Sequence, residues 1–128
     1  MKLRLHQNSI RLRLTQMDVA HFVKTSCVES AIEFGATPAD RFTYSLSAEV
    51  GLAAPTVNFE DRRIGVRIPK VLADEWTGSE NTRISTEHAI DRGRSLHILI
   101  EKDFACVKKR EGEDDVDTFP NPMANRMF

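Results

Sequence analysis

Apolar and polar residues alternate with a period of two through most of this chain, and this alternation restricts its fold more than any other feature. Successive side chains of a β-strand point to opposite faces, so the alternation predicts strands with one buried and one solvated face. The pattern is clearest from Ile10 to Leu14, from Phe42 to Ala48 and from Ile64 to Ile68. A more continuous apolar run, Leu96 to Ile100, predicts a central strand.

Two short segments carry helix signals instead. Thr15 and Asp18 have the spacing of a capping box, which predicts a helix that begins after Thr15 and ends near Ser26. Pro69 suits the first turn of a helix and Gly78 suits its end, so we expect a second helix from Lys70 to about Thr77.

These signals together predict an α+β fold of about eight strands and two helices. Consecutive strands joined by short loops pair antiparallel, and closure of a sheet hides its edges, so we expect a strongly curved or barrel-like, mainly antiparallel sheet. Residues 1–108 are expected to form a single domain. Residues 109–128 are acidic and contain proline, which predicts a flexible C-terminal tail.

Composition excludes several classes of protein. Formal charges sum to −1, and the arginines are not interleaved with exposed aromatic residues, so nucleic acid is disfavoured as a partner. The chain has no apolar run of the length that spans a membrane and no apolar signal-peptide block, which predicts a cytoplasmic protein without a membrane partner. Cys27 and Cys106 are too far apart for a redox or zinc-finger motif, and we expect both to be reduced thiols.

Positive charge gathers on the first predicted strands. Arg4, Arg11 and Arg13 alternate with apolar residues, and no acidic residue precedes Asp18. Because guanidinium groups suit phosphate and carboxylate, these arginines, with Lys102, are our candidate anion-binding residues. The alternative is an ordinary solvated sheet face, on which the arginines pair with carboxylates of neighbouring strands. Those carboxylates are Glu29, Glu33, Glu49 and Glu101.

A metal site is the second hypothesis. Glu101 and Asp103 lie two residues apart on a predicted strand, where both carboxylates would reach one face and could hold a divalent cation. Lys102 between them shares the parity of the apolar residues and would point toward the core unless the strand bulges or ends there. His88 and His97, on adjacent predicted strands, form a weaker zinc hypothesis. No other cofactor is indicated.

Three segments carry a family resemblance: NSIRLRLTQMDV at residues 8–19, LHILIEKDFACV at residues 96–107 and FPNP at residues 119–122. With these segments the chain resembles a family of short bacterial proteins of unknown function. The resemblance extends over essentially the whole chain, and it implies neither an activity nor any catalytic residue.

Two functional interpretations remain. The chain has none of the common phosphate-loop, dinucleotide, zinc-protease or serine-hydrolase motifs, which favours a small non-catalytic binding or protein-interaction module and leaves an enzymatic role undecided. The alternative is a metal-dependent binder or hydrolase of a phosphate-rich or other anionic small molecule. Its partner would then be that ligand instead of a protein. Both functional interpretations are compatible with a homodimer.

Overall fold

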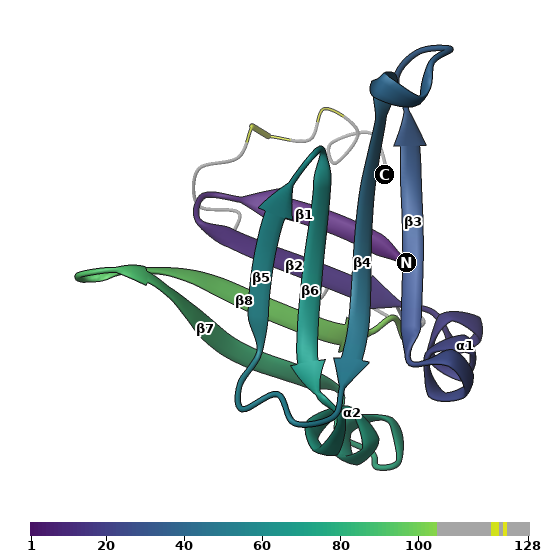
Figure 1. The fold of residues 1–128 in the computed structure, drawn as a ribbon, viewed down its shortest axis with the longest axis vertical. Helices are drawn as coiled ribbons and strands as arrows, with labels where there is room; N and C mark the ends of the chain where they lie inside the picture. Colours follow the sequence, from purple (N-terminus) through teal and green to yellow (C-terminus); the bar gives the residue numbers. More distant parts are fainter. Residues whose placement is uncertain (105–118, 121, 123–128) are drawn as a thin grey trace.

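The computed structural model describes residues 1–104, 119, 120 and 122, which form eight strands and two α-helices (Figure 1). The strands are β1 Lys2–His6, β2 Ser9–Leu14, β3 Cys27–Glu33, β4 Arg41–Glu49, β5 Thr56–Glu60, β6 Arg63–Pro69, β7 Arg83–Asp91 and β8 Arg94–Lys102. The helices are α1 Gln16–Thr25 and α2 Lys70–Thr77, and a 3-10 turn, η1 Pro38–Asp40, precedes β4. The predicted α+β class and numbers of elements are confirmed.

The strands divide into two sheets of four. Sheet A has the order β1-β2-β8-β7 and sheet B has the order β3-β4-β6-β5. Each sheet is mixed, because its two outer pairings are antiparallel while its central pairing, β2–β8 or β4–β6, is parallel. The expectation of one barrel-like, mainly antiparallel sheet is therefore wrong for the described residues.

The helices explain this difference. Consecutive strands do pair antiparallel as predicted, but α1 carries the chain from sheet A to sheet B and α2 carries it back. Each sheet therefore combines two antiparallel pairs from distant parts of the chain. The two strands at which these pairs join, β2 with β8 or β4 with β6, run parallel. In Figure 1, sheet B lies in front of sheet A and the strands of the two sheets cross at a steep angle, as in orthogonally packed sheets.

The core fills the space between the sheets. Its buried strand residues come from both sheets: Ile10, Leu12, Leu14, Val28, Tyr44, Leu46, Ile64, Val66, Ile68, Ile84, Ile98 and Ile100. The helices contribute Phe22, Ala73 and Trp76. The Phe22 and Trp76 rings meet edge to face, with centroids 6.4 Å apart, so α1 and α2 close the core together.

The two halves of the chain repeat one arrangement. The order β1-β2-α1-β3-β4 recurs as β5-β6-α2-β7-β8. The pair Ile10–Ile98 of sheet A corresponds to the pair Ile64–Tyr44 of sheet B. In this correspondence, each residue of the first half is 54 positions before its equivalent in the second half (10 and 64, 44 and 98). The same shift relates Phe22 to Trp76. The molecule thus has an internal pseudo-two-fold relation, and each half contributes one antiparallel pair to each sheet.

The predicted helix starts and ends agree with the observed ones. Thr15 caps α1 with both hydrogen bonds of a capping box: the Asp18 N–H donates to Thr15 Oγ1 (3.2 Å) and the Thr15 N–H donates to Asp18 Oδ2 (3.0 Å). Helix α2 ends before Gly78. Neither helix in the described part of the chain is long and apolar enough to cross a membrane.

Several predictions concern residues that the structure does not describe. The tail at residues 109–128 has only residues 119, 120 and 122 described, so its flexibility and the domain boundary at residue 108 stay predictions. Cys106 also lies outside the described residues. Cys27 is a half-buried free thiol, and burial together with the charge of Glu29 raises its pKa, which keeps the thiol protonated.

Candidate functional site

The side of sheet A that faces away from the core carries an unusual share of positive charge. The alternation of side chains, with Ile10, Leu12 and Leu14 buried, places the intervening residues of β2 and their cross-strand partners on this outer side. We call its five cationic residues the basic face: Lys2, Arg4, Arg11, Arg13 and Arg83. Among the described residues, the carboxylates on the same side are Glu87, Glu101 and Asp103.

Like charges lie directly opposite one another on this face. In the β1–β2 register, Lys2 pairs with Arg13 and Arg4 pairs with Arg11. Cross-strand pairs of like charge are destabilising by a few tenths of a kcal/mol up to about 1 kcal/mol. The Arg4 side chain is exposed and makes no hydrogen bond or ion pair with any residue in the described part of the chain. An anion bound here would relieve this repulsion.

Glu101 holds two of the arginines. Its Oε1 accepts from Arg11 Nε at 2.6 Å and from Arg13 Nε at 3.1 Å, and the three side chains are 13%, 26% and 19% exposed. Burial alone raises the pKa of Glu101, but the hydrogen bonds and charges of Arg11 and then Arg13 outweigh it, so the pKa lies below its usual value. Glu101 stays ionised and fixes both guanidinium groups, which together keep one positive charge in excess.

The other predicted site residues do not join the arginine cluster. Lys102 lies on the opposite side of sheet A from the arginines, where its Nζ donates to the Ser79 carbonyl (2.9 Å) and stands 5.7 Å from the centroid of the Trp76 ring. Lys102 thus points inward, as its parity indicates. Asp103 contacts Lys2 at 3.4 Å. The structure brings Arg4, Arg11 and Arg13 together and leaves Lys102 apart.

The carboxylates of the metal hypothesis already contact cations. Glu101 binds Arg11 and Arg13, and Asp103 binds Lys2. Within the described ranges, no three His, Cys, Asp or Glu side chains are grouped closely enough to hold a metal ion. His88 pairs with Leu96, and His97 pairs with Glu87, so the two histidines occupy opposite faces of sheet A.

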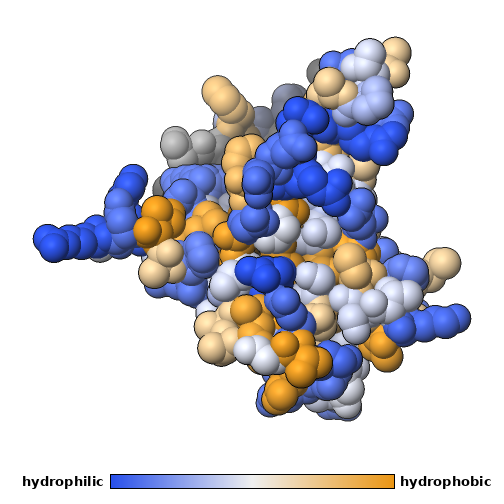
Figure 2. All heavy atoms as spheres, in the orientation of Figure 1, coloured by the Kyte–Doolittle hydropathy of each residue, from blue (hydrophilic) through white to orange (hydrophobic). Residues whose placement is uncertain are grey.

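Sheet B provides an internal comparison. At the positions equivalent to the basic face it has Thr56, Asn58, Gly65 and Arg67, which follow from the 54-residue shift, and Cys27, which pairs with Ser47 as Arg83 pairs with Glu101. Of these five residues only one is cationic. Figure 2 views the molecule from the sheet B side, where hydrophilic and near-neutral residues mix and apolar residues gather toward the end that carries α2.

The arginines of sheet B each have one carboxylate partner. Arg63 binds Glu29 at 2.9 Å and Arg67 binds Glu49 at 3.0 Å. Arg41 binds Glu33 at 2.7 Å in the same way. The alternative of an ordinary paired sheet face thus describes sheet B, whereas the equivalent face of sheet A keeps an excess of cations.

Two members of the basic face were missing from the residues selected by sequence. Arg83 joins because the β7–β8 register places it opposite Glu101, and Lys2 joins because it lies opposite Arg13. Alternation of side chains already indicated the orientation of Lys2. For Arg83, only the β7–β8 pairing shows that it lies opposite Glu101.

Comparison with known proteins supports the resemblance noted in the sequence. The model of a family of unknown function (DUF7009) matches residues 1–123, nearly the whole chain. No curated protein and no solved structure matches the chain. The assignment of any role therefore depends on the geometry of the chain itself.

Proposed function

We propose a binding role for this chain, which belongs to DUF7009, a family of unknown function. The basic face of sheet A binds an acidic segment of a partner protein. One observation carries this proposal: five cationic side chains share the face with three carboxylates, while the equivalent five positions of sheet B include one cation. A cytoplasmic location, predicted from the sequence, belongs to the same proposal.

The shape of the face favours an extended partner over a compact ligand. The cations are distributed over β1, β2 and β7 of one four-stranded sheet, which spans roughly 14 Å from first to last strand. Acidic residues along an extended segment could contact several of these cations in succession. Guanidinium groups bind carboxylates through two parallel hydrogen bonds, which suits Asp and Glu side chains.

Prior positioning of the arginines supports the same role. Because Glu101 holds the Nε groups of Arg11 and Arg13, these half-buried side chains lose less conformational freedom when a partner binds. Arg4 adds a fully available cation next to them. This role involves no metal ion at Glu101 and Asp103, because both already contact cationic side chains.

Binding of fluorescein-labelled octaglutamate, measured by fluorescence anisotropy, tests this role. The Arg4→Ala variant should weaken binding roughly two- to fivefold, since an exposed charged contact contributes up to about 1 kcal/mol. Arg13→Ala should weaken it as well, while Arg67→Ala, at the equivalent position of sheet B, should leave it unchanged. Rising salt should weaken binding by the wild type.

Two results would contradict the proposal. Equal losses of octaglutamate affinity in Arg13→Ala and Arg67→Ala would show that the peptide is attracted to positive charge anywhere on the protein and not to the basic face. If tripolyphosphate raises the melting temperature while octaglutamate does not bind, the face selects a small polyanion and the protein-partner role is wrong.

A further inference from the structure

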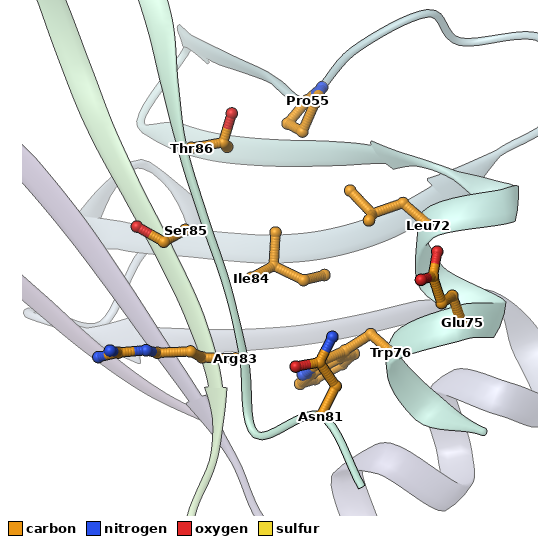
Figure 3. Close-up of a pocket in the computed structure, with 9 residues that line it drawn as sticks. All are labelled: Pro55, Leu72, Glu75, Trp76, Asn81, Arg83, Ile84, Ser85 and Thr86. Carbon is orange, nitrogen blue, oxygen red and sulfur yellow. The ribbon is translucent and has the colours of Figure 1, made fainter. Parts of the chain in front are cut away.

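A pocket of about 250 Å³ lies between α2 and the edge strand β7 (Figure 3). Pro55, Leu72 and Ile84 form apolar walls, and Glu75, Trp76 and Asn81 add polar groups. Its volume is slightly below the usual range of small-molecule sites, roughly 300 to 1,000 Å³, and such sites are mostly apolar with a few placed polar groups. The composition of the walls therefore suits a small organic ligand.

The indole of Trp76 supplies an unused donor. Trp76 is 1% exposed, and its Nε1 has no hydrogen-bond acceptor among the described residues. Figure 3 shows the ring extending from α2 toward β7. Buried indole N–H groups normally have a partner, because an unpaired one is costly. Because Trp76 also lines the pocket, we take a ligand in the pocket as the source of the missing acceptor.

Glu75 supplies an unpaired charge. Its side chain is exposed, contacts no cation in the described part of the chain, and turns its carboxylate toward the pocket in Figure 3. Arg83 contributes to the lining but extends its guanidinium away, toward the basic face. The mouth of the pocket is therefore negative, and it suits a ligand with a cationic group.

The edge of β7 adds backbone groups. Lys102 N–H donates to the Thr82 carbonyl, so the even-numbered residues of β7 direct their backbone toward β8. Arg83 and Ser85, which line the pocket, direct their N–H and C=O groups to the open edge, where the described residues provide no further strand. A ligand amide could exchange hydrogen bonds with this edge.

We infer that this pocket is a second binding site, for a small primary amine with an apolar body and a carbonyl or amide group. The carbonyl accepts from the Trp76 indole N–H, the apolar body lies between Leu72 and Ile84, and the ammonium group faces Glu75. Of the basic face, only Arg83 also lines this pocket.

The chain contains one tryptophan, so one indole resonance in a ¹H–¹⁵N correlation spectrum reports on the site directly. Three related probes separate its parts. The probe 4-(aminomethyl)benzamide carries both groups, 4-methylbenzamide lacks the amine and 4-methylbenzylamine lacks the carbonyl. Added 4-(aminomethyl)benzamide should shift the Trp76 indole resonance in a saturable way. Each of the other two probes should bind at least about fivefold more weakly.

The matched variants are Glu75→Gln and Glu80→Gln, which remove one exposed carboxylate inside and outside the pocket. Glu75→Gln should weaken 4-(aminomethyl)benzamide roughly fivefold and leave 4-methylbenzamide unchanged, while Glu80→Gln should change neither. The inference is overturned if no probe shifts the indole resonance at millimolar concentration. Equal effects of the two variants would overturn it as well.

Discussion

Glu101 places a single carboxylate oxygen between the Nε groups of Arg11 and Arg13. At the residue scale, Glu101→Gln keeps the shape but removes the charge and leaves two half-buried guanidinium groups with a neutral partner. We expect a loss of about 1 to 2 kcal/mol of unfolding free energy at neutral pH, measured by urea denaturation. Glu33→Gln removes half of an exposed pair with Arg41 and should have a much smaller effect.

The same residue predicts a pH dependence. The pKa of Glu101 is lower in the folded chain than in the unfolded chain, where it is about 4.3. Its contribution is therefore complete above that value and is lost as the pH falls through the folded pKa. The difference in stability between wild type and Glu101→Gln should close in acid, and a difference that stays constant from neutral pH to pH 3 would refute this explanation.

Capping distinguishes the two helices at the scale of the element. Helix α1 has a complete capping box at Thr15, whereas α2 begins after Pro69 with no side-chain cap. Thr15→Ala removes the acceptor for the Asp18 N–H and should lower the unfolding free energy by about 1 kcal/mol, measured by urea denaturation. Gln16→Ala, one residue further on the exposed first turn, should be close to neutral. Equal effects of the two variants would argue against the cap.

At the scale of the whole molecule, both sheets share one core. Phe22 and Trp76 meet at the end where the helices close it, so Phe22→Ala should cost about 3 to 5 kcal/mol. Unfolding should remain a single transition, with coincident Trp76 fluorescence and far-UV circular dichroism curves. Val23→Ala, on the exposed side of α1, is the control with a small expected effect. Two separate transitions would mean that the sheets unfold independently.

Residues of the candidate site were predictable only in part. Alternation along β1 and β2 placed Arg4, Arg11 and Arg13 on one face, and it also indicated the inward direction of Lys102. Their common partner, Glu101, is 88 residues from Arg13 and depends on the β2–β8 pairing. The pocket beside Trp76 had no local signal, because its walls come from α2, β7 and the loop at Pro55.

The local elements of this protein follow from interactions between residues that are close together in its sequence. Strand alternation, the Thr15 capping box and the stop at Gly78 act between residues close in the chain, so their physics can be read there. Only the tertiary structure decided that two helices divide the strands between two sheets with parallel central pairs. That choice depends on burying both apolar sheet faces and both helices in one core, a requirement that no single segment carries.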